Sequence, residues 1–360
     1  MTREELFALH IDEPDKSVYD KAKDHFDMLA KPIDGFGEFE DMICRIAAIQ
    51  GRVCPDISKR ALAVMFADNG VVESGVSQTD SSVTLDVARL FAKGESTVCV
   101  MTKGFDIDTV GVDVGIDSDE KIPGIIDRKV SRGTKNIEKE PAMTQEQCLE
   151  AVTAGIDIVK GLSDKGFTLI ATGEMGIGNT TTATALLCAL TGVKAKEVTG
   201  RGAGLSDEGL AKKLDVIQNA LKLHGAILPD KVSAEYALKM LTVLGGLDIA
   251  ALTGVFIGGA LCRIPVVTDG LISAVAALTA TYILPGCEKY MIASHQGRER
   301  GTRIALSHMG LKAVIDADMA LGEGTGAVMI IPVIDMIINV YNQGTSFESA
   351  QIQQYERYAK

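Results

Sequence analysis

The sequence predicts an α/β fold in which a parallel sheet is flanked by helices. Short apolar runs are followed repeatedly by a polar or glycine-containing turn and then by a helical stretch, which is the pattern of strand–helix units around a parallel sheet. The chain has 37 glycines, few aromatic residues and no tryptophan, which suits many strand-to-helix turns better than a β-sandwich. Its 360 residues are enough for a large core and one or two domains.

The expected strands are short apolar runs that end at polar or glycine turns: 61–67, 109–114, 167–171, 265–268 and 290–293. The expected helices carry apolar residues at helical spacing: most of 3–48, then 83–92, 145–162, 180–191, 207–223, 233–244, 248–262, 272–282, 300–309 and 326–340. Residues 116–142 are polar and charged, so they are expected to form a loop outside the core.

The two ends of the chain are predicted to form the smaller domain. The first helices have no strand partners in the sequence, and the last apolar helix also follows the final expected strand. We therefore expect a small helical domain made of 1–50 and about 310–360, and a large α/β domain over 51–309.

The overall charge limits the partners. A formal net charge of -12 repels nucleic acid and anionic membranes, so we expect neither as a partner. The seven cysteines are scattered and include no CxxC pair, which predicts a cytoplasmic protein without disulfides or a zinc site. The five histidines are equally dispersed, and we expect no metal and no redox cofactor.

Two neighbouring apolar runs, 241–262 and 264–284, are long enough to suggest a membrane hairpin. Asp248 lies in the first run and Asp269 in the second, and only Arg263 separates the two runs. Helices buried against a sheet explain the apolar character and the Gly254-x-x-x-Gly258 pair equally well. Buried helices are the favoured interpretation, with a membrane protein as the alternative.

A glycine-rich loop over residues 173–181 (GEMGIGNTT) is the first strong functional signal. It follows an expected strand and precedes an expected helix, so its backbone N–H groups and the helix N-terminus can bind an anion. The spacing from Gly173 to Gly178 nearly matches a nucleotide-binding P-loop, but Asn179 replaces the lysine that serves β- and γ-phosphates. The loop therefore predicts a monophosphate site; a tight strand-to-helix turn without a ligand is the alternative.

Glu323, in the segment 321–326 (LGEGTG), is the second signal. A glutamate between two glycines can approach a substrate closely, and burial would raise its pKa toward that of a general base. The alternative is a flexible turn in which Thr325 caps the last helix. Glu174, within the glycine loop, is expected to face ribose hydroxyls, or else to bond with the N–H groups of the loop itself.

Polar turns at other strand ends are expected to converge on the same crevice, because ligands of open parallel sheets bind beyond the carboxyl ends of the strands. These turns are 68–70, Asp269-Gly270 and Ser294-His295. The glycine cluster 200–204 precedes another helix and can add N–H groups to the phosphate site. Lys213 on that helix reads as solvated surface unless a partner subunit meets it.

Taken together, these motifs resemble the nicotinate-nucleotide–dimethylbenzimidazole phosphoribosyltransferase family. The motifs that carry the resemblance occur in the same order over about residues 28–335: KPIDGFGEFE at 31–40, ADNGV at 67–71, GVS at 75–77, VT at 83–84, the loop 173–181, GRGAG at 200–204, DGLI at 269–272, SH at 294–295 and LGEGTGA at 321–327.

The resemblance implies a Rossmann-like fold, a homodimer with sites near the subunit interface, and transfer of ribosyl phosphate from nicotinate mononucleotide to an aromatic base in cobalamin biosynthesis. It implies that Glu323 is the catalytic base and that a lysine from the other subunit, here Lys213, joins the site. The implied phosphate site comprises Gly176, Gly178, Asn179, Thr180 and Gly202, and the implied base pocket comprises Ser77, Met175, Leu321 and Glu323.

The chain departs from the family pattern at Asn69, Asp248, Gly297 and Ala320, where the family usually has histidine, glutamate, serine and arginine. These departures leave open which acceptor is used: dimethylbenzimidazole, another benzimidazole, a purine or a phenol. They also leave open a paralogous partner subunit or a non-catalytic nucleotide-binding protein. A kinase or ATPase is a further alternative, which Asn179 in place of the P-loop lysine disfavours.

Overall fold

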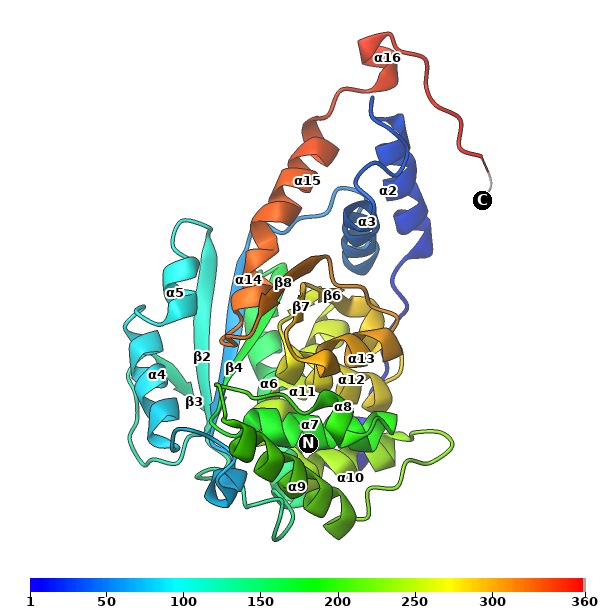
Figure 1. The fold of residues 1–360 in the computed structure, drawn as a ribbon. Coiled ribbons are helices and arrows are strands. Elements are labelled where there is room, and N and C mark those ends of the chain that lie inside the picture. Colours follow the sequence, from blue (N-terminus) through cyan, green and yellow to red (C-terminus); the bar gives the residue numbers. More distant parts are fainter. Residues whose placement is uncertain (359–360) are drawn as a thin grey trace.

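The computed structural model of the chain describes residues 1–358, and its centre is a parallel sheet of six strands (Figure 1). The strand order is β3-β2-β1-β4-β5-β6, which confirms the predicted α/β class. The strands are β1 (Arg60–Ala67), β2 (Ile107–Gly115), β3 (Ile125–Asp127), β4 (Leu169–Met175), β5 (Val266–Thr268) and β6 (Met291–Ala293). The sheet grows in one direction from β1 to β3 and in the other from β4 to β6, so its topological switch point lies between β1 and β4.

Both faces of the sheet are covered, and β1 shows how the sequence achieves this. Successive side chains of a strand point to opposite faces. Ala61, Ala63 and Met65 accordingly belong to one buried core, whereas Leu62 and Phe66 belong to the other. A strand that is apolar at every position is thus explained by helices on both sides, as is usual for parallel sheets.

The helices fill both layers and the connections. They are α1 (Arg3–Phe7), α2 (Lys16–Met28), α3 (Glu38–Gln50), α4 (Ser82–Ala92), α5 (Thr97–Met101), α6 (Gln145–Asp164), α7 (Asn179–Thr191), α8 (Ala195–Val198), α9 (Asp207–Leu223), α10 (Ala234–Leu244), α11 (Leu247–Cys262), α12 (Leu271–Ile283), α13 (Arg300–His308), α14 (Thr325–Met329), α15 (Ile331–Gln343) and α16 (Phe347–Ala350). Short 3₁₀ turns, η1 (Gly70–Ser74) and η2 (Cys287–Tyr290), complete the set, and β7 (His295–Gly297) pairs with β8 (Ile315–Met319) in a small second sheet.

The apolar runs that suggested a membrane hairpin form α11 and α12, which are largely buried in the core. The glycines of α11 allow close packing on α6: a side chain at Gly254 would collide with the carbonyl oxygen of Val152, and one at Gly155 with that of Ala251. One helical segment, 325–343, is long and apolar enough to cross a bilayer by composition, and half of its most apolar window is buried inside the protein.

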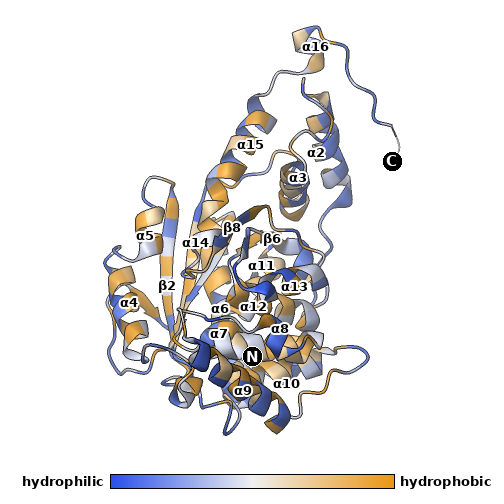
Figure 2. Ribbon diagram, in the orientation of Figure 1, coloured by the Kyte–Doolittle hydropathy of each residue, from blue (hydrophilic) through white to orange (hydrophobic). Residues whose placement is uncertain are grey.

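Helices from both ends of the chain lie together at the top of Figure 1 as α2, α3, α15 and α16. Figure 2 shows hydrophobic and hydrophilic residues along both α2 and α15, as expected for helices with one buried face. By contrast, α1 packs on the large core through Leu6, and β8 pairs with β7. The division into domains at residues 50 and 310 stays a prediction.

Several elements differ from the sequence-based expectation. The segment 116–142 was expected to be a loop, but it contains the strand β3. The three residues of β3 pair with the edge of β2. The single helix expected over 326–340 is divided into α14 and α15 at Ile330, where a proline in the first turn of α15 cannot donate a helical hydrogen bond. The strand β4 continues through Met175, so the glycine loop is shorter than predicted and turns only at Gly176.

Candidate active site

A cavity of about 380 Å³ lies at the carboxyl ends of the central strands. It is lined by segments that are far apart in the sequence: 76–79 after β1, 174–180 at the end of β4, 201–205, 269–272 after β5, and 319–323 before α14. Of the strand-end turns predicted to converge, 173–181, Asp269-Gly270 and His295 contribute to this cavity, whereas 68–70 does not line it and Asn69 is buried. Of the thirteen residues proposed from the sequence, eleven line this cavity; Lys213 and Ser294 do not.

The glycine loop at the end of β4 lies at the switch point of the sheet. Gly178 is the N-cap of α7 with φ of 92°, and no side chain caps this helix within the described part of the chain. In the first turn of the helix, the N–H groups of Asn179 and Thr181 donate to the carbonyl oxygens of Gly176 and Gly178, and Thr180 between them lines the cavity at the positive end of the helix. Gly176 packs so closely on β1 that a side chain there would collide with the carbonyl oxygen of Ala67. Two glycines are thus required for different reasons: one for a left-handed turn, the other for close contact.

Lys213 approaches this loop from α9. Its side chain is 1% exposed and its Nζ donates a hydrogen bond to Thr180 Oγ1 over 2.8 Å. A side chain at Gly202 would press on the same two groups, so Thr180, Gly202 and Lys213 meet at one point. Burial lowers the pKa of Lys213 to about 8, against the opposing effect of Glu299. The lysine thus contacts the loop of its own chain, whereas the resemblance implied a lysine that reaches over from another subunit.

The position of Lys213 yields a testable prediction. Lys213→Met should weaken binding of nicotinate mononucleotide about 10- to 100-fold, because a hydrogen bond from a charged donor to phosphate contributes about 1.5–3 kcal/mol. In the wild-type protein the affinity should also fall as the pH rises through about 8, since the free amine loses its charge there. Calorimetric titration between pH 7 and 9.5 measures both effects.

Lys222→Met is the matched control, because Lys222 is exposed near the end of the same helix. It should leave the affinity and its pH dependence unchanged. A Lys213→Met variant with wild-type affinity at pH 7 would contradict the assignment of this amine to the phosphate.

Glu323 lines the same cavity from an unusual backbone turn. Three successive residues, Gly322, Glu323 and Gly324, have positive φ angles of 91°, 60° and 88°. The glutamate N–H donates to the carbonyl oxygen of Glu174 over 3.2 Å, which joins this turn to the end of β4. Burial raises the pKa of the half-buried Glu323 carboxyl, and the nearby charge of Asp269 raises it further. The backbone N–H of Val98 and the hydroxyl of Ser96 oppose this shift.

The segment that contacts Glu323, at the start of α5, was missed by the sequence analysis. The Val98 N–H lies 3.5 Å from Glu323 Oε2, and Thr97 lines the cavity. No local pattern in a five-residue helix distinguishes it from any other surface turn, and only its contact with a segment more than 220 residues later gives it a role.

Glu174 belongs to a buried group of polar side chains below the cavity. The Asn179 side-chain amide donates to Glu174 and, over 2.9 Å, to Asp248. Burial, reinforced by the charges of Asp248 and Asp269, raises the pKa of Glu174 to about 8. Burial also raises the pKa of Asp248 to about 6. At neutral pH Glu174 is therefore largely protonated and can donate a hydrogen bond to a ligand oxygen.

Asn179 differs from its predicted role in one respect. Its side chain is directed at two carboxyl groups rather than at the phosphate position, and its backbone N–H donates to the Gly176 carbonyl oxygen over 3.2 Å. The residue that replaces the P-loop lysine thus stabilises buried carboxyl groups beneath the loop.

A further part of the cavity lining comprises the residues expected to contact an aromatic base. Ser77, Met175 and Leu321 line the cavity, and Leu321 is 54% exposed although it is a large apolar residue. An exposed leucine beside Met175 offers apolar surface to a planar ring. These three residues are brought together as the resemblance implies.

Two residues from the strand-end turns are structural rather than exposed to the cavity. The Ser294 side chain is fully buried and its hydroxyl donates to the Thr268 carbonyl oxygen. Asp269 borders the cavity, but its carboxylate accepts hydrogen bonds from the backbone N–H groups of Gly324, Gly326 and Ala327. A direct contact between either side chain and a substrate stays a prediction that this geometry does not favour.

The four departures from the family pattern fall into two places. Asn69 and Asp248 are completely buried below the glycine loop, where Thr182 Oγ1 donates to Asn69 Oδ1 over 3.2 Å. Gly297 and Ala320 line the cavity itself. The first pair therefore supports the loop, whereas the second pair shapes the space open to a ligand.

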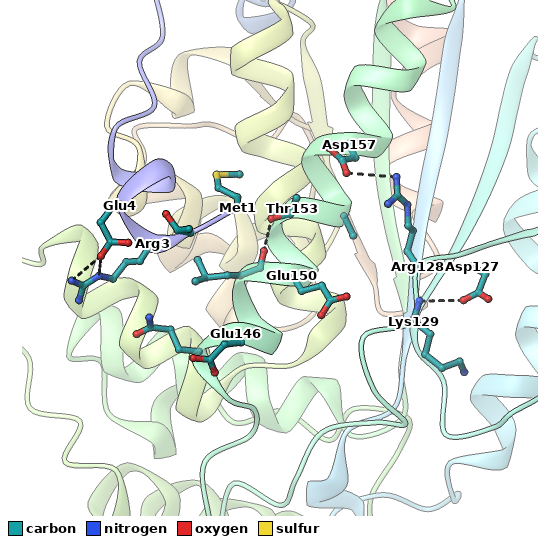
Figure 3. A pocket seen from close by; sticks show the side chains of 14 residues that line it. Met1, Arg3, Glu4, Asp127, Arg128, Lys129, Glu146, Glu150, Thr153 and Asp157 are labelled. Atoms are coloured by element: carbon teal, nitrogen blue, oxygen red, sulfur yellow. Dashed lines mark hydrogen bonds and ion pairs between the residues drawn. The ribbon is translucent and has the colours of Figure 1, made fainter.

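A larger cavity, of about 620 Å³, lies elsewhere, between α1, α6 and the end of β3 (Figure 3). Figure 3 shows ion pairs within it, such as Arg128 with Asp157 at 3.5 Å. None of the residues predicted from the sequence lines it. Several of its charged groups are paired with other side chains, and it carries none of the glycine loops that would bind an anion.

Across residues 1–358, one group of side chains is close enough to share a metal ion: Asp27, Asp34 and Glu40 in the helical region. Lys23, Lys31 and Arg357 form ion pairs with these carboxylates. Their charge is therefore compensated by protein cations, and the group lies outside the set of residues that line the 380 Å³ cavity.

Comparison with known proteins identifies the same family as the sequence motifs. A family model described as phosphoribosyltransferase matches residues 11–352. The nicotinate-nucleotide–dimethylbenzimidazole phosphoribosyltransferase of Acetivibrio thermocellus is 42% identical over 341 residues, which cover 95% of each chain. The enzyme of the same name from Ruminiclostridium cellulolyticum is 41% identical over 336 residues, which cover 93% of this chain and 94% of that one.

Solved structures agree with the sequence comparison. The fold matches a crystal structure of the nicotinate-nucleotide–dimethylbenzimidazole phosphoribosyltransferase from Thermus thermophilus with a TM-score of 0.86 and 34% identity. The match covers 95% of this chain and 100% of that chain. A crystal structure of CobT from the same organism matches with a TM-score of 0.87 and 35% identity over 94% of this chain and 100% of that one.

Proposed function

We propose that this chain, which belongs to the nicotinate-nucleotide–dimethylbenzimidazole phosphoribosyltransferase family, transfers ribosyl phosphate from nicotinate mononucleotide to a lower-ligand base such as 5,6-dimethylbenzimidazole. The products are α-ribazole phosphate and nicotinate, in the biosynthesis of cobalamin. The observation that carries the proposal is the position of Glu323, a carboxyl group with a raised pKa on the wall of the cavity that also contains the start of α7.

The chemistry needs one base and a phosphate anchor. The nicotinate ring is cationic at its glycosidic nitrogen, so it leaves without a general acid. The incoming azole must lose a proton when it becomes an N-riboside, and Glu323 accepts this proton. Attack from the face opposite the leaving ring converts a β-glycosidic bond into an α bond, through an oxocarbenium-like state as in inverting glycosyl transfer. The helix N-terminus holds the phosphate, so positioning contributes much of the acceleration.

The residues around the sugar and the base have separate roles in this proposal. Glu174, whose pKa is raised to about 8, donates a hydrogen bond to a ribose hydroxyl. Met175 and Leu321 contact the acceptor ring, and Ser77 lies at its edge. Because Gly297 and Ala320 are smaller than the family's usual serine and arginine, they leave room for an acceptor other than dimethylbenzimidazole. A homologue that uses a purine or a phenol is therefore the alternative.

The partners in this proposal are nicotinate mononucleotide and an aromatic base, with no nucleic acid and no membrane. We propose a cytoplasmic homodimer with sites near the subunit interface, as the resemblance implies; a heteromer with a paralogue is the alternative. Size-exclusion chromatography with light scattering of the purified chain distinguishes a homodimer from a protein that needs a second subunit.

The test is incubation with nicotinate mononucleotide and a panel of azoles, purines and phenols, followed by mass analysis of the ribotides. We expect release of nicotinate together with one equivalent of α-ribotide, and the largest yield with benzimidazoles. Binding of nicotinate mononucleotide without any ribotide would favour a non-catalytic nucleotide-binding protein. Binding of a nucleoside triphosphate in calorimetry, with no binding of nicotinate mononucleotide, would favour a kinase or ATPase.

A further inference from the structure

The turn that presents Glu323 is intrinsically unfavourable. Glu323 is a non-glycine residue with φ of 60°, which costs an L-residue about 1–2 kcal/mol relative to right-handed conformations. Such a residue persists only where surrounding contacts determine its conformation. The two flanking glycines permit the turn, but they also permit many other conformations, so they cannot by themselves select it.

The contacts that select this turn come from Asp269. One carboxylate oxygen accepts the N–H of Gly324 at 3.1 Å, and the other accepts the N–H groups of Gly326 at 2.9 Å and Ala327 at 3.1 Å. The carboxylate thus holds the residue after Glu323 together with the first turn of α14. Asp269 is 2% exposed and directly follows β5, so it is fixed to the rigid centre of the sheet.

A second contact closes the other side of this turn. The His295 ring lies against Gly326 so closely that any side chain at Gly326 would collide with it. His295 Nδ1 lies 4.0 Å from Asp269 Oδ1 and 3.0 Å from the Ser294 hydroxyl. The start of α14 is therefore held between the carboxylate of Asp269 and the ring of His295.

We infer that Asp269 is a positioning residue for the transfer reaction: it fixes the backbone that presents Glu323 and acts through that residue rather than by touching the substrate. This inference rests on the proposed function, in which Glu323 is the base. It replaces the sequence-based assignment of Asp269 to substrate binding, because both carboxylate oxygens are occupied by backbone N–H groups.

Asp269 also influences the electrostatics of Glu323. The titratable groups that surround Glu323 are Glu174 from β4, Asp269 after β5 and His295 from β7. The negative charge of Asp269 raises the pKa of Glu323, in addition to the larger effect of burial. Removing that charge should therefore lower the pKa of the base; a variant that keeps the charge but displaces the turn shows how much of any shift comes from greater exposure of Glu323.

Two variants separate position from charge. Asp269→Asn removes the charge and one acceptor oxygen. Asp269→Glu keeps the charge and displaces the carboxylate by one methylene. Both should lower kcat at least about tenfold, because misplacement of a reacting group by about 1 Å can cost up to about 100-fold. Both should keep the KM for nicotinate mononucleotide within about twofold, since the phosphate site lies on another segment. Only Asp269→Asn should move the acid limb of the kcat–pH profile to lower pH.

Asp230→Asn, at an exposed loop position, is the matched control and should behave as the wild-type protein. Circular dichroism and binding of nicotinate mononucleotide establish that each variant is folded. If Asp269→Asn does not fold, Asp269→Glu decides: reduced kcat with unchanged nucleotide affinity supports the inference, and full kcat overturns it.

The remaining outcomes are distinct. Wild-type protein that forms no ribotide overturns the proposed function and this inference with it. Active wild-type protein together with an Asp269→Asn variant of unchanged kcat overturns the inference alone. A loss of kcat in Asp269→Asn with an equal loss of affinity for nicotinate mononucleotide also overturns it, because a general structural defect would give that result.

Discussion

Glu323→Gln is expected to lower kcat about 10²- to 10⁴-fold while leaving the affinity for nicotinate mononucleotide within about twofold, as for loss of a general base. The glutamine side chain has nearly the same size, and the turn that Asp269 holds through the backbone N–H groups of Gly324 and Gly326 stays intact. It cannot accept the azole proton. The nucleotide affinity is expected to remain because the proposed phosphate site is at the start of α7, on a different segment from Glu323.

The pH dependence gives a second measurement of the same residue. Burial raises the pKa of Glu323, so the wild-type kcat should increase with pH as this carboxyl group ionises. Glu323→Gln should lack that limb. Steady-state rates between pH 5 and 9 with nicotinate release as the readout, together with calorimetric titration of the nucleotide, separate loss of chemistry from loss of binding. Glu235→Gln, at an exposed position of α10, is the control. Near-normal turnover in Glu323→Gln would remove the base assignment.

Gly176→Ala is expected to have the second largest effect, on nucleotide binding. The added methyl group would collide with the Ala67 carbonyl oxygen and lie 2.9 Å from Asp248 Oδ2. The backbone of β1 cannot give way cheaply, so the glycine loop must move away from the end of that strand. A displaced loop moves Thr180 and the N-terminus of α7 away from the proposed phosphate position, and we expect a loss in affinity of about 10- to 100-fold.

Calorimetric titrations with nicotinate mononucleotide and with the free acceptor base test this. Gly161→Ala is a matched control, because a methyl group at Gly161 meets nothing within 4 Å and the residue lies inside α6. The nucleotide should be weakened far more than the base. If both ligands weakened equally, the phosphate would have to bind elsewhere in the cavity. Thermal unfolding of the two variants shows how much of the change is loss of stability.

From the sequence, the candidate chemical groups of the site were easier to predict than the distant residues that hold those groups in place. The glycine loop at 173–181 and the Gly-Glu-Gly turn could be recognised because each packs its chemical groups into a few consecutive residues. The parallel sheet was predictable for a similar reason: runs such as 61–67 are apolar at every position, which only a strand covered on both faces requires. The strand β3 was missed because three residues beside charged neighbours carry no periodic signal.

What no local pattern could reveal are contacts between distant segments. Lys213 reads as a surface residue in its own helix, and only the packing of α9 against α7 buries it beside Thr180. Asp269 reads as a turn residue, and only the fold sets its carboxylate against N–H groups more than 50 residues later.

The amino-acid sequence alone determined the α/β class and predicted a phosphate loop and a candidate base, because periodicity, backbone freedom and ionisable groups are properties of neighbouring residues. The tertiary structure decided which ionisable side chains are buried, which are paired with other side chains and which line the cavity. Those properties determine the pKa values of Glu174 and Lys213, and they arise only when strands far apart in the chain bring their ends to one edge of the sheet.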